Sequence, residues 1–174
     1  PQLSHLSIAV NVSSRQFCET HFVQSVTDIV QQFGVDPGKL KIELTESQLS
    51  SNVEEIISKM SELKRFGIKF SLDDFGTGYS SLSYLKRFDI NYIKIDRSFV
   101  CNLHRASEDV ALCQAIIVMA HQLGIQVVAE GVETQEQHSI LLEAGCDFGQ
   151  GYWYCKPITT TEMTQRLVQE NLKI

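Results

Sequence analysis

The amino-acid sequence predicts an α/β fold, a β/α barrel of which this chain supplies about six of the eight β/α units. Three observations predict it: short apolar segments alternate with helical ones, most helices end at a glycine, and each apolar segment ends in a polar, ligand-type residue. Strands that alternate with helices form parallel units with right-handed crossovers. A doubly wound sheet concentrates its site at one switch point, whereas a barrel draws on the ends of many strands. The third observation therefore favours the barrel.

The expected strands are short segments rich in Val, Ile and Phe, residue types that favour extended chain. They cover residues 6–12, 40–44, 68–72, 92–95, 125–129 and 148–154.

The expected helices carry apolar residues at helical spacing and cover residues 18–33, 53–66, 82–88, 108–123, 135–144 and 162–172. Three of them begin with a capping box, in which a hydroxyl and an acid or amide three residues later satisfy free N–H groups. The boxes are Ser51 with Glu54, Thr134 with Gln137, and Thr159 with Glu162. Four helices end before a glycine that suits a left-handed turn, namely Gly34, Gly67, Gly124 and Gly145.

Composition indicates one globular domain over residues 1–174. The chain has 15 Lys and Arg against 21 Asp and Glu, a net charge of −6, and 43% hydrophobic residues. This acidic balance argues against a partner such as polymeric nucleic acid, which requires a basic face. Five scattered cysteines without C-x-x-C spacing indicate reduced thiols, and no stretch approaches the roughly 20 apolar residues of a membrane span. We expect a cytoplasmic domain that makes no membrane contact.

The length is short for a complete barrel. The six strands share 174 residues, which is 174/6 = 29 residues for each unit. A β/α barrel has eight strands and typically about 250 residues. We therefore expect that about two units are absent from the N-terminal side of this chain.

The polar residues at the strand ends have the chemistry of a metal centre. Asn11, Glu43, Asp73, Asp74 and Glu130 offer only oxygen atoms. Such hard donors select Mg²⁺ or Mn²⁺, or Ca²⁺ as an inactive occupant, over zinc and copper. Four carboxylates at one rim repel one another, so a pair of cations is the natural way to hold them together. Lys94 adds a positive charge that can hold a water or stabilise phosphoryl charge.

A structural interpretation competes with this one. A single acid at a strand end is more often a helix cap or a salt-bridge partner. Six strands that all end in ligand-type side chains favour the functional interpretation.

Taken together, six ordered motifs closely resemble the EAL domain of bacterial cyclic-di-GMP phosphodiesterases, over essentially the whole chain. The motifs are Asn11-Val12-Ser13, Glu43-Leu44-Thr45-Glu46-Ser47, Asp73-Asp74-Phe75-Gly76-Thr77-Gly78-Tyr79-Ser80-Ser81, Lys94-Ile95-Asp96, Ala129-Glu130-Gly131-Val132-Glu133 and Gln150-Gly151. The resemblance implies a modified TIM-type barrel with an antiparallel first strand. It also implies hydrolysis of cyclic-di-GMP to linear pGpG with two Mg²⁺ or Mn²⁺ ions.

By the same resemblance, the metal ligands are Asn11, Glu43 and Asp73 for one ion, with Asp73 bridging to a second beside Asp74 and Glu130. The catalytic set is Lys94, Glu130 and Gln150. Lys94 and Gln150 match positions that hold metal-bound or nucleophilic water, and Glu130 has an alternative role as general base.

The resemblance further implies a loop that couples metal binding to dimerisation. Its residues are Phe75, Gly76, Thr77, Gly78, Tyr79 and Ser80, with Glu46 as the anchor. The implied partners are a second copy in a homodimer and covalently linked sensory or diguanylate cyclase domains, in a parent that is cytoplasmic or membrane-anchored with this domain on the cytoplasmic side.

The Glu-Ala-Leu signature of the family is missing, because Glu143-Ala144 is followed by Gly145 in a helical segment. In the family that first Glu is a metal ligand, so we expect these residues alone to be weakly active or inactive. The alternative function is a non-catalytic cyclic-di-GMP receptor or protein-interaction module. A receptor can lose Asp74, Lys94 or Glu130 without penalty, and all three are present here.

Overall fold

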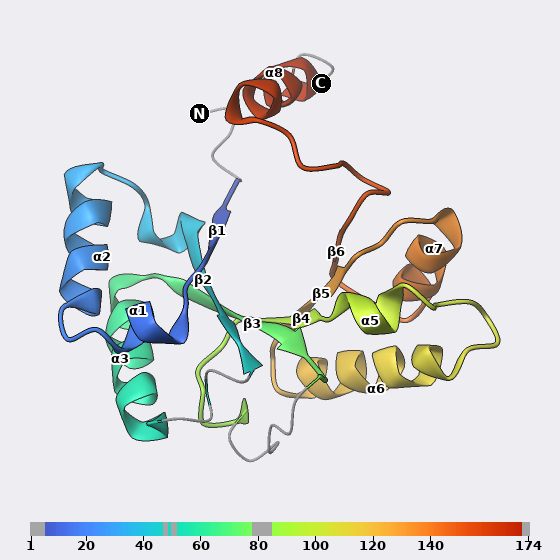
Figure 1. Cartoon of the computed structure of the whole chain (residues 1–174), viewed down its shortest axis with the longest axis horizontal. Coiled ribbons are helices and arrows are strands. Elements are labelled where there is room, and N and C mark those ends of the chain that lie inside the picture. The colour runs from blue at the N-terminus through green and yellow to red at the C-terminus, as the bar shows by residue number, and fades with distance from the viewer. Residues whose placement is uncertain (1–5, 47–48, 50–51, 78–84, 172–174) are drawn as a thin grey trace.

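The computed structural model describes residues 6–46, 49, 52–77 and 85–171, and within them the chain forms a single sheet of six parallel strands. The strands are β1 (Ile8–Asn11), β2 (Leu40–Thr45), β3 (Lys69–Phe75), β4 (Tyr92–Ile95), β5 (Gln126–Glu130) and β6 (Phe148–Gln150). Each strand pairs with the next one along the chain, so the order has no switch point. The sheet curls as part of a barrel (Figure 1), which confirms the predicted α/β fold.

Helices lie between β1 and β2, between β2 and β3, between β4 and β5 and between β5 and β6, as the alternating pattern predicts, and one more helix follows β6 (Figure 1). They are α1 (Ser14–Cys18), α2 (Phe22–Gln32), the short 3₁₀ turn η1 (Pro37–Lys39), α3 (Val53–Phe66), α5 (Arg97–Val100), α6 (Glu108–Gln122), α7 (Gln135–Glu143) and α8 (Thr160–Asn171). None of the helices in the described part of the chain has both the length and the apolarity needed to cross a bilayer.

The predicted helix ends are largely confirmed. Thr134 and Gln137 form the reciprocal bonds of a capping box, as do Thr159 and Glu162. The third box falls partly outside the described residues, because Ser51 is not among them. All four glycines at the predicted helix ends have positive φ angles, as a left-handed turn requires: Gly34, Gly67, Gly124 and Gly145.

Two predicted elements were wrong in their extent. The helix expected over residues 18–33 begins only at Phe22, as α2. Cys18 instead ends the separate helix α1, which starts at a capping box of Ser13 and Gln16 and stops where Glu19 adopts an extended ψ of 138°. The strand expected over residues 148–154 stops at Gln150, where the chain turns and the Tyr154 N–H bonds to the Gly151 carbonyl oxygen. Residues 82–84 of the helix expected over 82–88 lie outside the described part.

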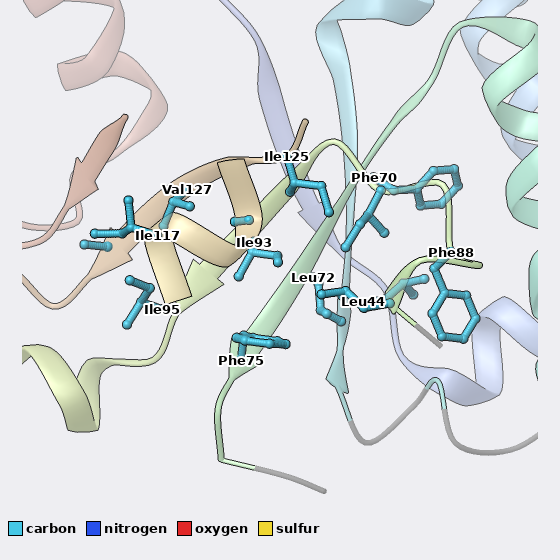
Figure 2. Packing of buried hydrophobic residues seen from close by; sticks show 14 of the residues in the cluster. Leu44, Phe70, Leu72, Phe75, Phe88, Ile93, Ile95, Ile117, Ile125 and Val127 are labelled. Atoms are coloured by element: carbon cyan, nitrogen blue, oxygen red, sulfur yellow. The ribbon is translucent and has the colours of Figure 1, made fainter. Parts of the chain in front are cut away.

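The hydrophobic core lies between the outer face of the sheet and the helices. Alternate strand residues such as Phe70, Ile93 and Val127 are fully buried there, and Ile117 of α6 packs in the same cluster (Figure 2). Because side chains alternate between the two faces of a strand, the residues between these core positions point to the inner face. The inner face carries the polar residues of the motifs.

Candidate metal centre

The sheet register brings the predicted site residues to one rim. Asn11, Glu130 and Gln150 are each the last residue of their strands. The last three positions of the other strands hold Glu43, Asp73, Asp74 and Lys94. Asn11 is paired with Glu43, and Glu130 with Gln150, in the Cα register of neighbouring strands. Parallel strands place their carboxyl ends at the same edge, so the ends of these six strands lie along one rim.

Lys94 lies at the centre of this site. Its Nζ is 2.6 Å from Glu130 Oε1, 3.0 Å from Glu43 Oε2 and 3.1 Å from Asp73 Oδ1. The Lys94 side chain is only 5% exposed, and those of its three partners are between 11% and 18% exposed. Carboxylates from β2, β3 and β5 thus converge on one buried ammonium group from β4.

Asp74 joins the same cluster through an unusual backbone conformation. Consecutive strand residues normally point to opposite faces of a sheet. Asp74 has a φ of +55°, and the pairing of β3 with β4 is irregular between Leu72 and Phe75. The Asp74 N–H donates to Asp73 Oδ1 at 3.1 Å. As a result, oxygens of Asp73, Asp74 and Glu130 lie within 4.8 Å of one another.

The cluster carries an excess of negative charge. Four carboxylates and one ammonium group sum to −4 + 1 = −3 if all are ionised. Burial, with smaller contributions from Asp73 and Glu43, raises the pKa of Glu130 despite its hydrogen bond to Lys94. Burial and the charges of Asp73 and Asp96 raise the pKa of Asp74. Burial alone would lower the pKa of Lys94, but the three surrounding carboxylates raise it above its ordinary value.

These residues fit a divalent cation. All the donors of the cluster are carboxylate oxygens, which hard cations such as Mg²⁺ and Mn²⁺ prefer. A cation there would also offset charge that Lys94 leaves uncompensated. Asn11 and Gln150 lie beside cluster residues in the register, although no described contact joins their side chains to the four acids.

The first part of the predicted loop is held at the rim by Glu46. This buried carboxylate accepts the Gly76 N–H at 3.0 Å. Gly76 has a φ of +98°, and a Cβ there would lie 2.9 Å from the Phe99 ring, so both conformation and space require glycine. Thr77 donates its hydroxyl to the Asp74 carbonyl oxygen. Gly78, Tyr79 and Ser80 lie outside the described residues.

The structure adds polar residues that the motif analysis did not assign to the site. Ser71 is buried on the inner face beneath Asp73, and its hydroxyl has no hydrogen-bond partner in the described structure. Asp96 caps α5 and contributes to the raised pKa of Asp74. Ser71 could have been predicted to face the site, because it lies two residues before Asp73 in the same strand and side chains on one face alternate every two residues.

Comparison with known proteins gives a consistent result. The model of a family described as "EAL domain" matches residues 2–157. The signaling protein YkoW of Bacillus subtilis is 40% identical over 165 residues, which is 95% of this chain and 21% of YkoW. The cyclic di-GMP phosphodiesterase NbdA of Pseudomonas aeruginosa is 38% identical over 162 residues, 93% of this chain and 21% of NbdA. This chain thus spans about a fifth of the length of these curated relatives.

Solved structures share the fold at similar identity. The EAL domain of Mycobacterium smegmatis DcpA superposes with a TM-score of 0.91 at 38% identity, covering 96% of this chain and 75% of that one. The PaMucR phosphodiesterase in complex with c-di-GMP has a TM-score of 0.88 at 37% identity, covering 92% and 72%. A manganese and cyclic-di-GMP complex of Klebsiella pneumoniae BlrP1 has a TM-score of 0.80 at 32% identity, covering 87% and 39%.

Proposed function

Because this chain belongs to the EAL domain family, we propose that it forms most of the catalytic barrel of a metal-dependent phosphodiesterase that hydrolyses cyclic-di-GMP to linear pGpG. The observation that carries the proposal is the convergence of Glu43, Asp73, Asp74 and Glu130 at one rim. The relative NbdA is named as a phosphodiesterase for this nucleotide, and the PaMucR structure is a complex with it.

In this proposal the rim holds two Mg²⁺ or Mn²⁺ ions, with Ca²⁺ as an inhibitory occupant. Asn11, Glu43 and Asp73 would hold one ion, and Asp73, Asp74 and Glu130 would hold the other. Divalent cations at such a site stabilise phosphoryl oxygens and activate water for in-line attack.

Other polar side chains of the chain would orient the attacking water and the phosphoryl group beside these metal ligands. Water attacks the phosphorus, the bond from phosphorus to one 3′ oxygen breaks, and that oxygen takes up a proton, which leaves pGpG. If cations bound Glu43, Asp73 and Glu130, the ammonium group of Lys94, which contacts these three carboxylates, would become free to donate hydrogen bonds to the attacking water and to the charged phosphoryl group. Glu130, whose pKa is raised, is suited to accept the proton of that water. Gln150, beside Glu130 in the register, would orient the same water.

We place the remaining part of the barrel in a segment of the native protein N-terminal to these residues. The DcpA domain extends beyond the matched region by about a quarter of its length, and the Glu-Ala-Leu signature is absent here. Both edges of the sheet expose apolar side chains, with Ile8 62% and Phe148 47% exposed. On this view residues 1–174 are one EAL-type barrel domain without its first units, and by themselves weakly active or inactive.

The wider context belongs to the same proposal. We place the domain in the cytoplasm or on the cytoplasmic side of a membrane-anchored parent, as a homodimer coupled through residues 75–80. Linked sensory or cyclase modules are supported by relatives such as the bifunctional diguanylate cyclase/cyclic di-GMP phosphodiesterase MucR of Pseudomonas aeruginosa, of which this chain covers 23%.

The test is nucleotide analysis of the native protein that contains this chain. We expect incubation with cyclic-di-GMP to give pGpG with Mg²⁺ or Mn²⁺ and much less with Ca²⁺, as measured by liquid chromatography. Binding of the nucleotide without turnover under all three metals would overturn catalysis and favour the non-catalytic receptor.

A further inference from the structure

The contacts of Lys94 have a second consequence, separate from catalysis. Its ammonium group touches one oxygen each of Glu43, Asp73 and Glu130, all within 3.1 Å. These are the same carboxylates that the proposed metal centre requires. A divalent cation at this centre and the ammonium group of Lys94 would therefore compete for the same carboxylate oxygens.

Lys94 is the cation that contacts the cluster in the described structure, and the nearby basic residues are engaged elsewhere. Arg97 pairs with Glu133 at 2.8 Å. Lys41, on the inner face below, has its Nζ over the ring of Tyr92 at 4.0 Å. Without metal, the mutual repulsion of the carboxylates is thus offset by this one buried side chain.

We propose that Lys94 is an internal counter-cation, which holds Glu43, Asp73 and Glu130 together in the metal-free protein and competes with divalent cations for their oxygens. The inference rests on the part of the proposed function in which these carboxylates bind metal. It assigns to Lys94 control of metal affinity and of metal-free stability, in addition to any role in turnover.

The experiment compares Lys94→Met with a matched control, Lys39→Met, in the native protein that contains this chain. Both substitutions remove one positive charge. Lys39 is a suitable control because it ends η1 at the amino end of β2, away from the rim. In EDTA we expect Lys94→Met to melt on the order of 10 °C below the control, because buried carboxylates lose their partner. Saturating Mn²⁺ should remove that difference.

The second readout is Mn²⁺ affinity, measured by calorimetry. We expect Lys94→Met to bind Mn²⁺ at least about fivefold more tightly than Lys39→Met, since even the repulsion between two unit charges about 4 Å apart in bulk water has that effect. Equal or weaker binding by Lys94→Met would overturn the competition. A melting deficit that persists in saturating Mn²⁺ would overturn the counter-cation role, because it would indicate lost packing.

If Lys94→Met does not fold without metal, the double variant Lys94→Met/Glu130→Gln decides the matter. It removes one charge of each sign, so we expect it to fold and to melt within a few degrees of the parent protein in EDTA. Failure of the double variant as well would overturn the charge-balance explanation. Absence of Mn²⁺ binding in the parent protein would overturn the metal centre and this inference together, whereas binding without turnover would contradict only the proposed phosphodiesterase activity.

Discussion

The two faces of the same six-stranded sheet are built on opposite physical principles. On the outer face Phe70, Ile93 and Val127 are fully buried against helices and against one another (Figure 2). On the inner face, residues of the same strands place carboxylates around Lys94. One face removes apolar surface from water, while the other concentrates like charges in a poorly hydrated place.

This difference separates stability from function. Apolar burial contributes roughly 25 cal/mol per Å² to folding, so the outer face supplies the driving force. A buried ion cluster contributes little net stability, because desolvation offsets the attraction between its charges. We therefore expect substitutions on the outer face to destabilise the fold, and neutral substitutions of the inner-face carboxylates to spare the fold while removing activity.

The largest effect should follow Asp73→Asn on the inner face. Loss of the bridging ligand that we propose at Asp73 should remove several kcal/mol of transition-state stabilisation and lower the proposed turnover of cyclic-di-GMP at least about a thousandfold. The fold should persist, because the substitution reduces the excess negative charge around Lys94. Chromatography of the products and thermal melting in EDTA measure the two outcomes. Retained turnover would contradict the functional role of the inner face. Unfolding of the variant without metal would contradict the expectation that this substitution spares the fold.

A smaller effect in free energy should follow Phe70→Ala on the outer face. Here we expect the stability of the fold to fall, whereas Asp73→Asn should lower the activity. A fully buried Phe truncated to Ala costs about 3–5 kcal/mol of unfolding free energy through lost burial and the cavity left behind. The control Phe33→Ala, at a side chain that is 71% exposed, should change it by less than about 0.5 kcal/mol. Urea unfolding measures both. Equal costs for the two variants would contradict the assignment of Phe70 to the core.

The smallest effect should come from Asp147→Asn, at the amino end of β6. Asp147 Oδ2 accepts the Val127 N–H and lies 2.8 Å from His121 Nε2. Although burial opposes it, these two partners lower the pKa of Asp147 below its ordinary value. A carboxyl group with a depressed folded-state pKa adds stability above its unfolded pKa and loses it as the pH falls through the folded value.

We therefore expect Asp147→Asn to cost about 1 kcal/mol of unfolding free energy at pH 7, with the cost shrinking below about pH 4. Urea unfolding at pH 7 and pH 3 measures this change. Glu19→Gln, at an exposed carboxylate, is the control and should show no such trend. If the loss of unfolding free energy were the same at pH 7 and pH 3, the charge of Asp147 would not contribute to stability. If turnover were lost, Asp147 would have a functional role, which we assign only to residues of the rim.

Much of the architecture could be predicted because it depends on local pattern. Short segments rich in Val, Ile and Phe between helical patterns located all six strands, and the glycines marked the ends of four helices. The short helix α1 was not predicted, and the start of α2 was set four residues early at Cys18, because apolar spacing continues from Cys18 to Phe22 across the break at Glu19. The end of β6 was missed because aromatic residues 152–154 resemble a strand in sequence, although the chain turns at Gly151.

By itself, the sequence determined which residue types stand at the strand ends, and thus the oxygen chemistry of the site and the family to which the chain belongs. Only the tertiary structure decided that Asp74 turns to the same side as Asp73, and that Lys94 binds three carboxylates at once. The physical reason is range. Periodicity and capping act between neighbours in the chain, whereas the charge balance around Lys94 joins residues up to 51 positions apart, which meet only when the sheet has formed.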